Sequence, residues 1–123
     1  MSWWGLPTRE VGKARLYSEK KIASAGTNTF YMKLAKAGFI KRVALHAGAD
    51  TEYFKLADAS MEMPEGGHTM RLAHGQLLPN YEDARVVENM DMPIQAHSKI
   101  RARFYGMTAG VTIWLQVAIL EVE

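Results

Sequence analysis

The sequence predicts an all-β protein, a single antiparallel β-sandwich of jelly-roll-like arrangement preceded by an N-terminal arm. Two observations lead to this prediction. Most segments alternate apolar and polar side chains with a period of two, and glycine, proline, Asn or Asp stands between them. In addition, residues 110–123 are apolar at nearly every position and rich in the β-branched side chains that favour strands.

The C-terminal stretch 110–123 is apolar on both of its expected faces. One row consists of Val111, Ile113, Leu115, Val117 and Ile119, and the other of Trp114, Ala118, Leu120 and Val122. A strand with one face in water would have a polar row, so the second face needs a cover as well. That cover is either another layer of the same domain or a neighbouring subunit. We expect the chain to be oligomeric through the row with Trp114, Ala118 and Leu120.

About eight strands are expected, at roughly the 8 to 12-residue spacing of sandwiches and barrels. In chain order they span residues 27–34, 39–47, 51–57, 68–73, 84–88, 94–97, 99–105 and 110–123. Where the alternation identifies inward residues, these are Phe30, Met32 and Leu34; Phe39, Val43 and Leu45; Phe54 and Leu56; Met70 and Leu72; and Ile100, Ala102 and Phe104. The whole chain, residues 1–123, is expected to form one domain.

Two segments fit the alternation less well. Residues 8–23 suit either a first strand, with Ala14 and Leu16 on one side, or a short helix. We favour a strand or an extended arm, and assign residues 1–12 to the arm. Residues 76–83 are expected to be a loop with one helical turn near Tyr81.

Composition excludes several classes of protein. The 123 residues contain no cysteine, so no disulfide, thiolate metal site or cysteine nucleophile is available. The net charge of +2, from 15 basic and 13 acidic residues, is too balanced for a dedicated nucleic-acid surface. The longest apolar run is too short to cross a bilayer as a helix. The N-terminus has no basic segment and no long apolar run, so no signal peptide is expected and synthesis takes place in the cytoplasm.

Histidines supply the candidate metal ligands. The segment Pro64-Glu-Gly-Gly-His68 resembles the second metal-binding motif of cupins, which are also small β-barrels. Cupins place one more residue before that histidine, and their first His-x-His motif is missing because His46 stands alone. A cupin-like metalloenzyme using His68 and His74 remains an alternative, but we expect neither a metal nor a cofactor.

Other catalytic patterns are missing from the sequence. The carboxylates are scattered, so none form a pair with one raised pKa, and no serine lies in a Gly-x-Ser-x-Gly turn. The expectation is therefore that the protein is not an enzyme.

A basic row stands on the expected strand 99–105. Lys99, Arg101 and Arg103 alternate along it and are followed by Tyr105, a pattern that a platform for single-stranded nucleic acid would show. A solvated sheet face or a contact with an acidic subunit explains the same row more simply, and we favour that interpretation.

Two adjacent tryptophans, Trp3 and Trp4, precede every expected strand and are followed by Gly5 and Pro7. Tryptophan buries a large apolar area when it finds a pocket. The pair either folds back on its own sandwich as a lid or docks on an adjacent subunit as an interface anchor.

Taken together, a short cysteine-free β-sandwich with an aromatic arm and an apolar C-terminal strand resembles the small jelly-roll capsid, cement and decoration proteins of bacteriophages and other viruses. The resemblance covers residues 25–123 and rests on architecture, without a motif. It implies a non-enzymatic structural protein of the virion, a homotrimer or higher oligomer, and contacts with a major capsid protein. The alternative outside this class is a carbohydrate-binding module that stacks sugars on Tyr53, Tyr81, Tyr105 or Trp114.

Overall fold

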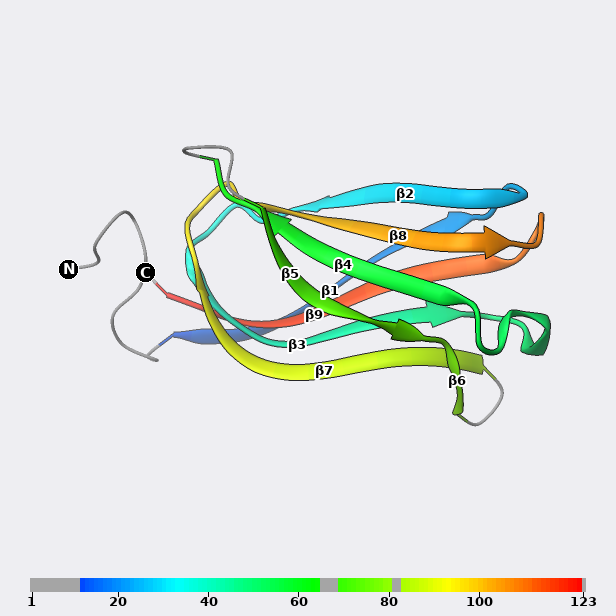
Figure 1. Ribbon diagram of the computed structural model, residues 1–123. Coiled ribbons are helices and arrows are strands. Elements are labelled where there is room, and N and C mark those ends of the chain that lie inside the picture. The colour runs from blue at the N-terminus through cyan, green and yellow to red at the C-terminus, as the bar shows by residue number, and fades with distance from the viewer. Residues whose placement is uncertain (1–11, 65–68, 81–82, 123) are drawn as a thin grey trace.

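The computed structural model describes residues 12–64, 69–80 and 83–122 of the chain. These residues form nine strands and one short 3-10 helix, and the strands build two packed layers (Figure 1). The elements are β1 Lys13–Ile22, β2 Gly26–Lys33, β3 Gly38–Ala47, η2 Asp50–Glu52, β4 Leu56–Glu62, β5 Thr69–Gln76, β6 Leu78–Asn80, β7 Asp83–Ile94, β8 Lys99–Met107 and β9 Thr112–Glu121. Within these residues no helix could span a membrane.

The strand order is that of a jelly roll. A five-stranded sheet runs β1-β9-β3-β7-β6 and a four-stranded sheet runs β2-β8-β4-β5, with antiparallel pairing throughout. Strands from the two ends of the chain therefore lie next to each other in each sheet, as in two wrapped Greek keys. The predicted fold class, an antiparallel jelly-roll-like β-sandwich, is confirmed.

The core lies between the two sheets and is built from alternate residues of the central strands. Ile113, Leu115 and Val117 of β9 are fully buried and face Ile100 and Phe104 of β8 across the sandwich. On β8 the alternate residues are apolar inward and basic outward, as the sequence predicted. Alternation at a period of two places every second residue of a strand on one face, which is why these short strands close a single core.

Strand β4 begins later than the expected strand 51–57. Residues 50–52 form the 3-10 helix η2, and the strand runs from Leu56 to Glu62. The expected inward pair, Phe54 and Leu56, is instead 59% and 54% exposed. Phe54 has a backbone φ of +69°, a left-handed conformation that breaks the strand at this point.

A bulge in β3 overturns one predicted face. The register of β3 against β9 shifts between Ile40 and Arg42, so the extra residue reverses the alternation. Phe39 therefore shares the outer face with Leu120, and Ile40 takes its expected place in the core. Val43 and Leu45 point inward as predicted.

Three other boundaries differ from the predictions. The expected strands 84–88 and 94–97 are the body and the end of one strand, β7, which continues through Pro93 and gives way to a turn before Ser98. The expected loop 76–83 contains the short strand β6. The segment 8–23 contributes β1, and the predicted arm, residues 1–12, lies outside the described residues except for Gly12.

Candidate functional site

The second apolar row of β9 points away from the core, toward the outside of the five-stranded sheet. Trp114, Ala118 and Leu120 are half-buried and do not belong to the core cluster. Directly opposed residues of antiparallel strands share a face, so the pairing of β9 extends this row onto both neighbours. We call the following set of outer-facing residues the apolar face: Ala14, Leu16, Phe39, Ala44, Trp114, Ala118 and Leu120. Polar residues share this side of the sheet and interrupt the set, among them Ser18, Lys20, Arg42 and Gln116.

The apolar face is least covered on β1. Leu16 lies opposite Ala118 and is 70% exposed, and Ala14 lies opposite Leu120 and is also exposed. Nine of the ten residues of β1 are exposed, including the side that looks toward the four-stranded sheet. The reason is the strand order, which places β1 at the margin of the wider sheet. No described residue of the protomer covers Leu16.

Trp114 and His46 close one end of the apolar face. A Cβ added at Gly48 would lie 3.0 Å from the Trp114 ring, so the indole packs on the backbone of that glycine. The His46 ring meets the indole edge-on, at 6.5 Å between centroids and an angle of 87°. His46 is 5% exposed, and burial, followed by the nearby Arg85 charge, lowers its pKa, although Asp83 works in the opposite direction at 3.7 Å. The histidine is therefore neutral at pH 7, which keeps this end of the face uncharged.

The outer face of the four-stranded sheet has the opposite character. We call the following residues of β8 and β4 the charged face: Lys99, Arg101, Arg103, Tyr105, Asp58 and Glu62. The Arg103 guanidinium contacts Asp58 with Nε–Oδ1 at 3.3 Å and Nη2–Oδ2 at 3.4 Å, and the Tyr105 hydroxyl donates to the same carboxylate at 2.6 Å. Glu62 lies 3.4 Å from Lys99 and 3.8 Å from Arg101.

These ion pairs determine how much free positive charge Lys99, Arg101 and Arg103 present to a ligand. The hydrogen bond to Asp58 raises the pKa of Tyr105, and burial adds to the effect. Each cation of β8 has a carboxylate on the neighbouring strand β4, but Lys99 and Arg101 share Glu62, so two carboxylates offset most of the charge of the three cations. This arrangement favours a solvated, self-paired sheet face over a track for nucleic-acid phosphates.

A buried carboxylate also joins β1 to β9. Glu121 is 7% exposed, and Arg15 donates to its Oε1 at 3.1 Å while the Tyr17 hydroxyl donates to its other oxygen. The hydrogen bond to Glu121 raises the pKa of Tyr17. Neither this carboxylate nor Asp58 is marked as a hydrogen-bond acceptor by the sequence alone, because Arg15 lies 106 positions from Glu121 and becomes its neighbour only through the strand order.

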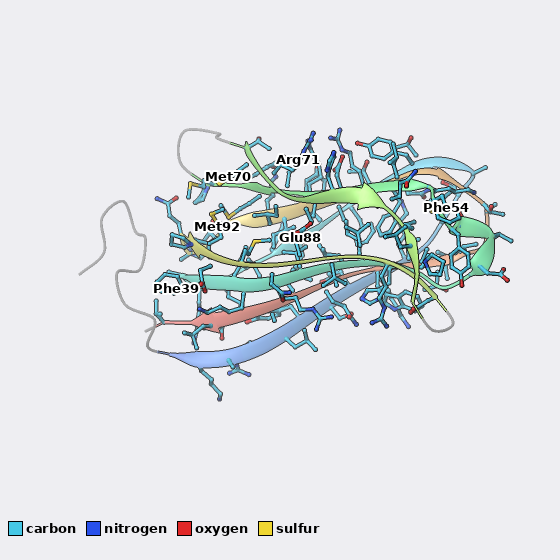
Figure 2. The ribbon with its side chains drawn as sticks, turned by 60° about the horizontal axis from the view of Figure 1, so that its bottom comes forward. Phe39, Phe54, Met70, Arg71, Glu88 and Met92 are labelled. Carbon is cyan, nitrogen blue, oxygen red and sulfur yellow. The ribbon has the colours of Figure 1, made fainter. Side chains whose placement is uncertain are left out.

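The other side of the sandwich, away from β1, is lined by β5 and β7. Figure 2 places Met70 and Arg71 on β5 and Glu88 and Met92 on β7 along that side. Met70 is 45% exposed and Met92 packs partly on the core. These residues do not join the apolar face, which lies over β1, β9 and β3.

The histidines do not converge. His74 of β5 lies opposite Asp58 on the charged face, His46 belongs to the five-stranded sheet, and His97 occupies a turn with a φ of +67°. His68 lies outside the described residues. Among the residues that the structure describes, no group of three His, Asp or Glu side chains is placed to hold a metal ion.

The aromatic residues named for sugar stacking are also dispersed. Tyr105 lies on the charged face, and Trp114 on the opposite side of the molecule in the apolar face. Tyr53 follows η2 and packs against Phe54, and Tyr81 is outside the described residues. The predicted anchors Trp3 and Trp4 also precede the described part of the chain.

No protein-family model matches this chain, and no curated protein matches its sequence. Solved structures share its fold. The Yersinia pseudotuberculosis-derived mitogen matches with a TM-score of 0.51 and 5% identity over 92% of this chain and 90% of that chain. TmCBM61, solved in complex with β-1,4-galactotriose, matches with a TM-score of 0.50 and 11% identity over 88% of both chains.

A viral protein is also similar. The structure of T=1 particles derived from infectious bursal virus matches with a TM-score of 0.47 and 16% identity, over 88% of this chain and 32% of that chain. The two matches with TM-scores of 0.50 and 0.51 support the β-sandwich fold and bear on nothing beyond it at such identities.

Proposed function

We propose that the protein is a non-enzymatic structural protein that self-associates through the apolar face and serves as a capsid, cement or decoration component of a virion, bound to a major capsid protein. The observation that supports it most is the outer face of the five-stranded sheet. Trp114, Ala118 and Leu120 lie there half-buried beside Leu16, which is 70% exposed. Large exposed apolar patches often mark interaction sites, and this face is the most apolar outer surface that the described strands present.

The energetics support association through this face. Burial of apolar area contributes roughly 25 cal/mol per Å², so a few hundred Å² covered on each subunit give several kcal/mol. His46 is neutral and sheltered at one end, so docking there does not require a charged imidazole to lose its water. The charged face, by contrast, has its ion pairs arranged within one protomer and needs no partner.

Sedimentation of the full chain tests the proposal. We expect an oligomer at micromolar concentration, and Leu120→Glu should lower its mass because the substitution places a charge in the apolar face and removes association there. Tyr31→Glu is the matched control, since Tyr31 is 46% exposed on the outer side of the other sheet. A soluble monomer at micromolar concentration would contradict self-association. Mass spectrometry of the source particles then checks whether the protein is a virion component bound to a major capsid protein.

A carbohydrate-binding role is the second candidate, and Tyr31 favours it. Its exposed ring lies opposite Arg101 on the charged face, and the Lys99 ammonium stands 5.0 Å from the ring centroid. An exposed aromatic ring beside hydrogen-bond donors is suited to stack on a sugar. Calorimetry with β-1,4-galactotriose tests this role. We expect Tyr31→Ala to abolish any heat of binding, and no heat with the native chain would count against that ligand.

A further inference from the structure

The free edge of β1 is the most regular strand edge in the molecule. Its ten residues pair one-to-one with β9, from Lys13 opposite Glu121 to Ile22 opposite Thr112, without a register shift. The other edge of β1 has no strand partner among the described residues. Such an edge presents a row of unpaired backbone N–H and C=O groups, which is a template for another strand.

The remaining sheet margins are each interrupted. The pairing of β2 with β8 shifts between Gly26 and Asn28, and that of β4 with β5 shifts between Ala59 and Ser60. The opposite margin of the five-stranded sheet consists of β6, three residues long, and the part of β7 that contains Pro93 and a bulge against β3. Bulges, short strands and proline are three of the features with which sheets protect an edge from pairing, and charged side chains are a fourth. In the described residues β1 has none of the first three, and it carries charges of both signs at Lys13, Arg15, Glu19, Lys20 and Lys21. Its charges therefore restrict which partner strand and which register the edge accepts.

The side chains of β1 are complementary to a second, antiparallel copy of the same strand in one register. With Leu16 at the centre, Leu16 meets Leu16 of the second copy and Arg15 meets its Tyr17. Ala14 then meets Ser18, and Lys13 meets Glu19, all of the second copy. Neither Lys13 nor Glu19 has an ion-pair partner within the described part of the protomer, so both are available for this contact. Opposed charges of opposite sign stabilise such a pair, and like charges destabilise it.

Neighbouring registers that keep the two faces matched fail this criterion. A centre at Tyr17 opposes Lys13 to Lys21, although it also opposes Arg15 to Glu19. A centre at Ser18 opposes Arg15 to Lys21, and a centre at Arg15 opposes that residue to itself. A pairing of odd with even positions would place side chains of opposite faces beside each other. The register centred on Leu16 is therefore the one among these that matches the faces without a like-charge pair.

We propose that two copies of the chain join their β1 strands antiparallel across a two-fold axis at Leu16, which merges two five-stranded sheets into one continuous sheet. This inference rests on the proposed self-association and names its partner, a second copy, and its register. The pairing brings the two apolar faces onto the same side of the merged sheet. It also accounts for the 70% exposure of Leu16 in the protomer, because that side chain would pack against its own copy at the axis.

A charge-exchange experiment tests the pairing. The background is Leu120→Glu, which removes association through the apolar face, so that the β1 dimer remains as the species seen in sedimentation. Lys13→Glu and Glu19→Lys, each added singly, should raise the dimer dissociation constant on the order of 10- to 100-fold, because each creates two like-charge pairs. Mixing the two single variants should restore a one-to-one dimer, since both contacts between positions 13 and 19 then join an acidic side chain to a basic one.

Lys21→Glu is the control, because Lys21 is exposed on the same side of β1 but lies beyond the paired residues 13–19. It should leave the dimer unchanged. A Leu120→Glu protein that is monomeric while the native chain is oligomeric would overturn the β1 pairing and leave the proposed function intact. A Leu120→Glu protein with the native mass would instead count against the apolar face. Charge variants that leave the dimer unchanged, or a mixture that fails to restore it, would overturn the pairing as well.

Cysteine cross-linking checks the register by a second route. The chain has no cysteine, so a single introduced thiol reacts only with its copy. Opposed residues of antiparallel strands have Cα atoms about 4.5 to 5.5 Å apart, within the range of a disulfide. In the same Leu120→Glu background, Leu16→Cys should cross-link on mild oxidation. Ile22→Cys should not, because the two thiols would be about 40 Å apart. Cross-linking at Ile22 but not at Leu16 would contradict the proposed register.

Discussion

The outer faces of the two sheets follow the same period-two alternation but carry opposite chemistry. On the four-stranded sheet the alternate residues are charged and form ion pairs between β8 and β4. On the five-stranded sheet the corresponding row is mainly apolar, although Gln116 lies within it and Arg42 opposite Ala118, and Leu16 of β1 is 70% exposed. The carboxylates of the charged face have their cations within one protomer, whereas no described residue covers Leu16. The inward residues of a strand indicate the core. Its outward residues indicate the environment of the outer face, which is charged and solvated on β8 and mainly apolar on β9.

Removing Asp58 should have the largest effect on stability. Asp58 is 5% exposed and accepts hydrogen bonds from Arg103 and Tyr105, so Asp58→Ala leaves both donors without their acceptor. We expect a loss of about 2 to 3 kcal/mol in the free energy of unfolding, measured by urea denaturation. Glu62→Ala is the control, because its looser ion pairs should contribute less than about 1 kcal/mol. If Asp58→Ala also dissociated the oligomer, the assignment of self-sufficiency to the charged face would be wrong.

Deleting residues 1–7 tests whether the N-terminal arm completes the apolar face of a neighbour. We expect the truncated sandwich to remain folded and its attachment to the neighbouring subunit to weaken by about 2 kcal/mol or more, because buried tryptophans are typical interface anchors. The double variant Trp3→Ala with Trp4→Ala should reproduce most of this loss in a sedimentation titration. A fall of several degrees in the melting temperature of the isolated subunit would instead assign the tryptophans to their own sandwich.

High pH should weaken the charged face through Tyr105. The folded-state pKa of Tyr105 is raised by its hydrogen bond to Asp58, so the stabilisation is present below about pH 10 and is lost as the pH rises through the folded pKa. Tyr105→Phe should cost about 1 kcal/mol at neutral pH and flatten this decline. Melting curves from neutral to strongly alkaline pH measure both effects. Tyr17, whose pKa is raised by Glu121, should contribute a second decline, which Tyr17→Phe removes while leaving that of Tyr105 in place.

Low pH should act on the apolar face through His46, with a smaller effect. The folded-state pKa of His46 is lowered by burial, so its stabilisation is present above about pH 6.5 and is lost as the pH falls toward the folded pKa. His46→Gln should remove this pH dependence of the free energy of unfolding. The dependence amounts to about 1.4 kcal/mol for each unit by which the pKa of His46 differs between the folded and unfolded states. Fluorescence of Trp114, whose ring meets that of His46, offers a direct signal. His74→Gln on the charged face is the control, and the same loss of pH dependence in that variant would contradict the assignment to His46.

The sequence was sufficient to predict the fold class, because β8 alternates with a period of two and β9 is apolar and rich in β-branched side chains. It failed at particular residues for physical reasons. The bulge after Ile40 reversed the face of Phe39, and the left-handed backbone of Phe54 broke a strand that the alternation had continued. The alternation of Ala57, Ala59 and Met61 with polar residues does mark β4, but its small side chains gave a weak signal. The pairs around Asp58 and Glu121 depend on strand order, which local patterns do not contain.

The position of β9 between β1 and β3 has a consequence for how the chain folds (Figure 1). Lys13 of the first strand pairs with Glu121 of the last, so the five-stranded sheet closes over nearly the full length of the chain. Pairing between residues so far apart in sequence carries a high entropic cost of loop closure, and such β topologies fold over roughly milliseconds to seconds. During translation β1 and β3 remain without their shared neighbour until β9 has been synthesised. Until then the edges of β1 and β3 that pair with β9 are exposed together with the apolar residues of β3. Aggregation is therefore most favoured before β9 has been synthesised, and chaperones or a low concentration of the chain would limit it.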